Sequence, residues 1–246
     1  MLTEKLTQKL IKMKKQISLW FAAIMILGAI NIFAQKPFAG TVSFAFTVEG
    51  TDDPNKAAEL SGVTMDYIVM GNCTKMSVSE MGIGVENITN GDDKVVSTVI
   101  DVPGYGKYYI EKNEADLKKA FETTKFDYNY TDETKEVAGY TCKKVIVTVT
   151  DLETDEEESF FAWVTNDLQT GDNINFSTYP GLKGYPLRMD IPQEDGNETY
   201  YIVQYAKSVT PSKKIKLTEF YRSSDATNLE EASEDVKTAL KQMLGM

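Results

Sequence analysis

The chain has 246 residues, of which 42% are hydrophobic, and its 26 basic and 37 acidic side chains give a net charge of −11. This composition is typical of a folded globular protein of one or two domains. Because the chain contains no histidine, Ser-His-Asp and Cys-His nucleophile systems and imidazole-based zinc sites are excluded, and the acidic balance argues against a nucleic-acid partner.

Residues 1–34 are typical of a secretory signal with an upstream extension, and Met13 is the alternative start. A basic pair begins at Lys14, an apolar stretch spans residues 17–30, and small residues ending at Ala34 form a cleavage pattern. The apolar stretch is shorter than the roughly 20 residues of a membrane-spanning helix, so cleavage is favoured over an anchor. We therefore expect a periplasmic or secreted mature chain without a membrane span.

From residue 38 onward, most segments show the period-two alternation of β-strands. In residues 41–48 the bulky apolar side chains fall on even positions. The Gly71-Asn72 pair between residues 65–70 and 73–78 predicts a hairpin. The other expected strands are residues 84–88, 94–100, 105–110, 143–150, 159–164, 187–191, 200–207 and 216–221.

Three segments interrupt this pattern and predict amphipathic helices. Residues 52–60 begin with a capping Asp followed by Pro, and residues 113–123 and 227–244 place apolar side chains at helical spacing. The sequence therefore predicts an α+β fold, with one curved antiparallel sheet of about ten strands and two or three covering helices. We expect a single domain over residues 35–246 that ends in the helix 227–244.

Two cysteines, Cys73 and Cys142, lie in strand-like segments. An even number of cysteines in an exported chain permits a disulfide, and two buried free thiols are the alternative. Neither cysteine has a histidine partner, so a catalytic role is not expected. The acidic residues 151–158 lack the spacing of a calcium loop and are interpreted as a solvated hairpin tip.

Aromatic side chains are abundant, with 13 Tyr, 11 Phe and 2 Trp, and many alternate along the expected strands. They could line an apolar ligand cavity in a concave sheet, or they could form the packed core between sheet and helices. The residues proposed as a cavity lining are Phe44, Phe46, Tyr109, Phe161, Trp163, Tyr201 and Tyr205.

Two motifs suggest a family. Residues 134–144 (TKEVAGYTCKK) and residues 179–189 (YPGLKGYPLRM) resemble segments of an exported Gram-negative family of unknown function. The likeness covers most of residues 38–221. That family is similar in architecture to the LolA/LolB-like carriers, which implies an unclosed antiparallel half-barrel whose helices plug a hydrophobic cavity for acyl chains.

These observations predict an exported, soluble, non-enzymatic binding protein that holds a lipid, an acyl chain or a lipidated protein on the concave face of its sheet. No catalytic residue, metal ligand or cofactor is expected. The alternative is a cell-envelope module that binds another protein and has a packed interior. The third hypothesis is an enzyme that uses carboxylates and no histidine. It ranks last, because no pair of acids in the sequence can be singled out as catalytic.

Overall fold

The computed structural model describes residues 37–60, 62–80, 82–196 and 198–244. The predicted signal peptide, residues 1–34, lies outside the described residues. Within them, no helix has the length and apolar character needed to cross a membrane.

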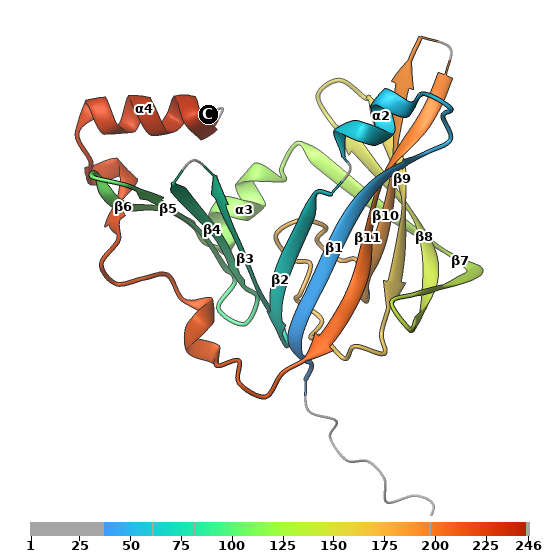
Figure 1. The fold of residues 1–246 in the computed structure, drawn as a ribbon, viewed down its shortest axis with the longest axis horizontal. Helices are drawn as coiled ribbons and strands as arrows, with labels where there is room; N and C mark the ends of the chain where they lie inside the picture. The colour runs from blue at the N-terminus through green and yellow to red at the C-terminus, as the bar shows by residue number, and fades with distance from the viewer. Residues whose placement is uncertain (1–36, 61, 81, 197, 245–246) are drawn as a thin grey trace, which may run out of the picture. The chain divides into compact units, whose positions relative to one another are not determined.

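The described chain is built on one open sheet of twelve strands in the order β12-β6-β5-β4-β3-β2-β1-β11-β10-β9-β8-β7 (Figure 1). All neighbours pair antiparallel except β12 and β6, which are parallel. The strands are β1 (Ala39–Glu49), β2 (Thr64–Met70), β3 (Cys73–Glu80), β4 (Ile83–Asn90), β5 (Val95–Val102), β6 (Gly106–Lys112), β7 (Thr124–Val137), β8 (Tyr140–Asp151), β9 (Glu157–Thr165), β10 (Tyr185–Asp195), β11 (Glu198–Pro211) and β12 (Thr227–Asn228).

In the described residues, three α-helices and two short 3₁₀ helices accompany the sheet. They are α2 (Pro54–Glu59), α3 (Glu114–Ala120), α4 (Glu234–Leu244), η1 (Leu217–Phe220) and η2 (Leu229–Glu231). Helix α3 begins with a capping box, in which the Asn113 side chain accepts from backbone N–H groups and Asp116 binds back to the Asn113 N–H. Helix α2 begins at the expected Asp53 cap and Pro54.

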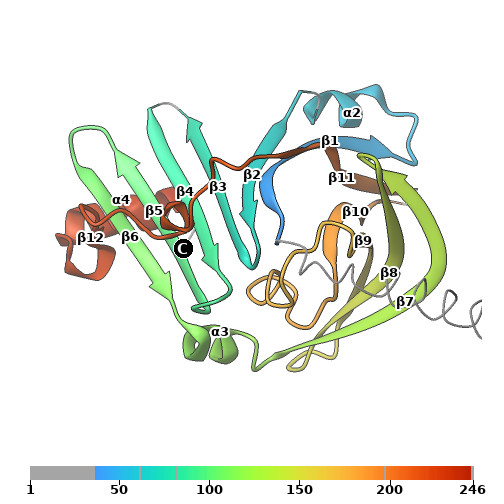
Figure 2. The same cartoon turned by 90° about the horizontal axis from the view of Figure 1, so that it is seen from below.

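Strand β1 lies in the middle of the sheet, where it pairs with β2 on one side and β11 on the other. Strands β2 to β6 follow one another as hairpins on one side of β1. On the other side, β11 to β7 curve around the segment between β9 and β10, and α3 connects β6 to β7 (Figure 2). We call this segment, residues 166–184, the inner loop.

The inner loop fills the concave side of the curved strands. Its Leu168 and Ile174 belong to a buried cluster that includes Phe44. Its Leu182 is 1% exposed and belongs to a second cluster that includes Val145. The concave wall of β7 to β11 is therefore packed by the protein itself.

Buried polar groups hold the inner loop in shape. The Asn175 amide donates to the backbone oxygens of Leu182, at 3.1 Å, and Gly184, at 2.8 Å. From β7, the Tyr128 hydroxyl donates to the Pro180 carbonyl at 3.1 Å. Since these bonds satisfy backbone acceptors that would otherwise be costly to bury, they stabilise the loop in its packed position.

The C-terminal segment, residues 212–244, contacts both faces of the β3–β6 region, and we call it the strap. Its Phe220 packs in a cluster with Val99, and its Leu229 and Leu240 pack in another with Ile100. Consecutive strand residues point to opposite faces, so the strap crosses from one face to the other. It does so at the edge of the sheet, where β12 pairs with β6 (Figure 2).

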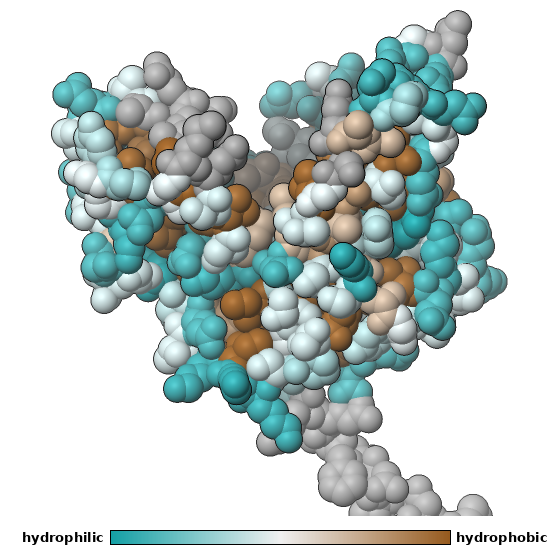
Figure 3. All heavy atoms as spheres, in the orientation of Figure 1, coloured by the Kyte–Doolittle hydropathy of each residue, from teal (hydrophilic) through white to brown (hydrophobic). Residues whose placement is uncertain are grey.

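Large exposed apolar side chains are scattered over the described surface. On the face drawn in Figure 3, apolar residues form separate patches with hydrophilic residues between them. Single exposed apolar residues are ordinary in soluble proteins and need no partner. The large hydrophobic residues with high exposure are Val63, Val78, Tyr105, Tyr130, Leu152, Leu217 and Tyr221.

The α+β expectation and the open, curved sheet are confirmed, with more strands than the ten expected. Strand β7 was not predicted, and residues 216–221, predicted as a strand, contain the 3₁₀ helix η1 instead. The predicted helix 227–244 is also too long, because α4 begins only at Glu234 and β12 and η2 precede it.

Candidate functional site: a cleft on the inner face of strands β2 to β6

The candidate site lies on the face of β2 to β6 that is turned toward the inner loop, which we call the inner face. Its floor consists of two neighbouring cross-strand rows, each defined by the antiparallel register of the five strands. The first row is Tyr67, Met76, Asn87, Thr98 and Ile110, and the second is Val69, Thr74, Thr89, Val96 and Lys112. Of these residues, Val69 is fully buried and does not line the cleft. With strands about 4.8 Å apart, each row is about 19 Å long from β2 to β6.

Two other elements wall this floor and leave a cleft of about 390 Å³. Leu117 of α3 forms one wall, and Ser177 and Thr178 of the inner loop form the other. Helix α3 is held in place by an ion pair of 2.7 Å between Glu114 and Lys94, the residue before β5. The hydrogen bond from Lys94 lowers the pKa of the Glu114 carboxyl, so this pair stays charged at neutral pH.

Most polar groups of the cleft are available to a ligand. The Thr98 hydroxyl donates to the Asn87 side-chain oxygen at 2.8 Å, which leaves the Asn87 amide hydrogens free to donate elsewhere. Among the described residues, the hydroxyls of Thr74 and Thr89 form no hydrogen bond within the protein, and Lys112 forms no ion pair. The lining contains no carboxylate. Such a surface offers hydrogen-bond donors next to apolar side chains.

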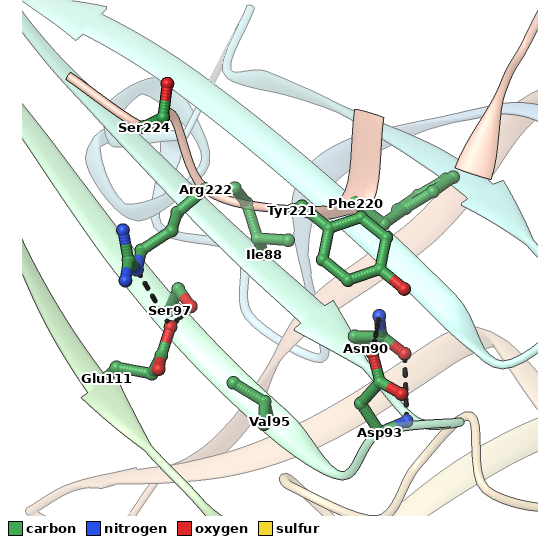
Figure 4. Close-up of a pocket in the computed structure, with 10 residues that line it drawn as sticks. All are labelled: Ile88, Asn90, Asp93, Val95, Ser97, Glu111, Phe220, Tyr221, Arg222 and Ser224. Carbon is green, nitrogen blue, oxygen red and sulfur yellow. Dashed lines mark hydrogen bonds and ion pairs between the residues drawn. The ribbon is translucent and has the colours of Figure 1, made fainter. Parts of the chain in front are cut away.

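A second pocket, of about 310 Å³, lies between the strap and the opposite face of β4 to β6 (Figure 4). Its polar groups bind one another. Glu111 accepts hydrogen bonds from Ser97 at 2.9 Å and from Arg222 at 3.1 Å. The Asn90 amide donates to Asp93 at 3.0 Å.

The guanidinium of Arg222 also lies 3.8 Å from the centre of the Tyr109 ring, a distance suited to a cation–π contact. Because the charged groups of this pocket are already paired, its chemistry fits anchoring of the strap better than ligand binding.

The seven aromatic residues predicted to line a cavity are divided between different surfaces. Phe44 pairs with Ala206 while its neighbour Ala45 pairs with Tyr205. In β2, Phe44 pairs with Met65, which lies on the same face as Tyr67, so Phe44 and Phe46 lie on the continuation of the inner face into β1. Tyr201 and Tyr205 lie on the opposite face of the sheet, which we call the outer face. Phe44 is buried and packs edge-on against Tyr67 at a ring separation of 5.5 Å.

Two further members of the predicted set, Phe161 and Trp163, share the outer face with Tyr201 and Tyr205, as the pairing through β10 shows. Phe161 stacks on Tyr201 at 6.2 Å, and the Trp163 indole donates to Asp190 at 3.1 Å. The seventh, Tyr109, lies under Arg222 on the other half of the sheet. None of the seven lines the inner-face cleft, and a ligand-binding role for them stays a prediction.

The residues that line the cleft were not singled out by the sequence. The signal that could have found them is the hairpin register, because the Gly71-Asn72 turn fixes which residues of β2 and β3 face each other. Polar residues at Asn87 and Thr98 would then fall on the same face as Tyr67 and Met76. Such a polar row within an apolar face is unusual for a core.

Both cysteines are free and buried, and they belong to different clusters, so the structure has the second of the two alternatives, two buried free thiols, and not the disulfide. Burial raises the pKa of the Cys142 thiol to about 11, and burial also raises the pKa of Cys73.

The acidic residues 151–158 lie at the β8–β9 turn, where the Asp151 carboxylate accepts a hydrogen bond from the backbone N–H of Glu153. No group of potential metal ligands is found in the described part of the chain.

No protein-family model matches the chain, and no curated protein matches it. Among solved structures it is similar to PNGF-II in two crystal forms. The C2 form has 17% sequence identity and a TM-score of 0.51 over 82% of this chain and 32% of that chain. For the P21 form the identity is 17% and the TM-score 0.50, over 82% of this chain and 33% of that chain.

The chain thus spans about a third of the length of PNGF-II, and at this identity the similarity concerns the fold alone. It confirms a β-rich fold. The resemblance to the LolA/LolB-like carriers fits only loosely, through the open curved sheet, and no family match carries it.

Proposed function

We propose that this protein is a non-enzymatic binding protein that holds a small amphipathic ligand, such as a single-chain lipid, in the inner-face cleft. The observation that carries the proposal is the open cleft of about 390 Å³, whose polar groups have few partners within the protein. Small-molecule sites usually measure roughly 300–1,000 Å³ and combine apolar walls with a few polar groups. The cleft fits both criteria.

The lining favours a ligand with both apolar and polar parts. Met76, Val96, Ile110 and Leu117 supply apolar surface, and burying a hydrocarbon chain against them contributes about 25 cal/mol per Å² of area removed from water. Threonine hydroxyls and the Asn87 amide lie beside them. A purely apolar guest would leave these groups without hydrogen bonds, at a cost in binding free energy.

Export supports this role, because a protein outside the cytoplasm meets lipids released from membranes. The support for export is the signal-like pattern of residues 1–34. We place the protein in the periplasm or outside the cell, where its partner is a lipid-like molecule.

The test is binding of dodecanoic acid and dodecanol to the full-length chain, measured by displacement of a fluorescent fatty-acid probe and by native mass spectrometry. The variant Thr89→Trp fills the middle of the cleft floor and should weaken binding at least tenfold. Its control is Ser77→Trp, which adds the same bulk to the opposite face of β3, where Ser77 is exposed. Binding that is unaffected by Thr89→Trp, or absent from the unmodified chain, would refute the cleft as a lipid site and favour a protein partner.

A further inference from the structure

The charge of the cleft differs from that of the whole chain. The chain carries 37 acidic and 26 basic residues, yet the cleft lining contains Lys112 as its one charged side chain. No described carboxylate pairs with Lys112, whereas the other two lysines of β2 to β6, Lys75 and Lys107, form ion pairs with Glu86 and Asp225. An anionic ligand would therefore find an unneutralised positive charge in this cleft and meet no repelling carboxylate in its lining.

The neighbours of Lys112 add hydrogen-bond donors. Lys112 lies opposite Val96 and diagonal to Thr98, a position that a long side chain can reach. Thr98 donates to the oxygen of Asn87, so the two amide hydrogens of Asn87 remain as donors on the same face. These donors suit a ligand headgroup that accepts hydrogen bonds and donates none.

The single positive charge of the cleft lining favours some anionic ligands over others. A lone lysine neutralises one charge, and the lining contains no arginine, whose forked guanidinium is the usual partner of phosphate groups. A monocarboxylate matches this site better than a phosphate dianion. Ile110, two residues before Lys112 on β6 and on the same face, begins the first floor row. This row leads across Asn87 to Met76, so an extended chain whose headgroup lies at Lys112 can follow it.

We infer that the cleft selects the carboxylate of a single acyl chain, with the Lys112 ammonium as its ion partner, the Asn87 amide as a donor and the tail lying toward Met76. This inference rests on the proposed function and specifies its ligand. It predicts that the protein distinguishes a fatty acid from a fatty alcohol of the same length.

The experiment compares dodecanoate with dodecanol at pH 8 by displacement of a neutral fluorescent probe. For the unmodified chain we expect dodecanoate to bind about fivefold more tightly, the ratio expected for one partly exposed ion pair. Lys112→Gln should abolish this preference, because it weakens the binding of dodecanoate and leaves the binding of dodecanol unchanged. Lys112→Arg should keep the preference. Lys207→Gln changes the net charge equally at an exposed position on β11 and should keep the preference.

Two results would overturn the inference. Equal binding of both ligands to the unmodified chain, or a preference that survives Lys112→Gln, would show that the carboxylate is not recognised while the lipid site itself stands. If neither ligand binds, the proposed function fails as well. Because the Lys112 side chain is exposed, its replacement leaves the packed core intact, and unchanged dodecanol binding reports a folded variant.

Discussion

Anchoring of the strap gives a quantitative test of the fold. Phe220 is 1% exposed and packs with Ile88 and Val99 on the face opposite the cleft. Phe220→Ala removes about 2 kcal/mol of transfer free energy from the folded state. A cavity of roughly 100 Å³, at about 24 cal/mol per Å³, adds a further cost of about 2 kcal/mol. We therefore expect the free energy of unfolding to fall by about 4 kcal/mol if the strap unfolds together with the sheet.

The measurement is urea unfolding followed by tryptophan fluorescence and by circular dichroism, with limited proteolysis of the strap as a local probe. The control is Leu217→Ala in the same 3₁₀ helix, where the side chain is 43% exposed and the expected loss is below about 1 kcal/mol. A loss below about 1 kcal/mol for Phe220→Ala, with no faster cleavage of the strap, would refute the packing argument.

Two further predictions concern buried positions. Burial raises the pKa of Cys142 from 9.0 to about 11. The folded protein therefore holds the thiol proton more tightly than the unfolded chain, and the resulting stabilisation is fully present below pH 9 and is lost as the pH rises toward 11. Cys142→Ala should therefore show a shallower fall of unfolding free energy between pH 9 and 11, and an identical slope would contradict the assignment. A Cβ on Gly91 would lie 2.7 Å from the backbone oxygens of Asn72 and Asn173, so Gly91→Ala should lower the unfolding free energy by about 2 kcal/mol or more. Gly84→Ala, whose Cβ meets only ordinary contacts, serves as the comparison in thermal unfolding, and equal losses for the two variants would argue against the backbone clash.

The hairpins from β2 to β6 could be predicted because their signals are local. The Gly71-Asn72 turn and the alternation of neighbouring residues specify strands that pair with the next segment along the chain. Strand β7 was not predicted, although Phe126, Tyr128 and Tyr130 alternate with polar residues in its first half. Its second half, residues 131–136, is mostly polar and exposed and has no such alternation. Its extended backbone is fixed by pairing with β8, and tertiary context of this kind overrides local propensity.

The cleft could not be predicted because it depends on features that no single segment contains. Alternation shows that Phe44 and Phe46 share a face, and that Tyr201 and Tyr205 share one, but it does not show which pair faces inward. That choice is set by the register between β1 and β11, with its irregularity between Ser43 and Phe44. The packing of the inner loop, which closes the curved side and leaves the β2–β6 side open, is equally non-local.

The central position of β1 constrains the order in which this protein can assemble. Its partner β11 follows it by about 150 residues, so the first strand to emerge keeps an unpaired edge until most of the chain is available. During synthesis or export, that edge is a template for wrong pairing with other chains. A chain truncated after β10 would lack β11, the strand that joins β1–β6 to β7–β10 in one sheet. The two parts would keep unpaired edges, and the chain would be prone to aggregate.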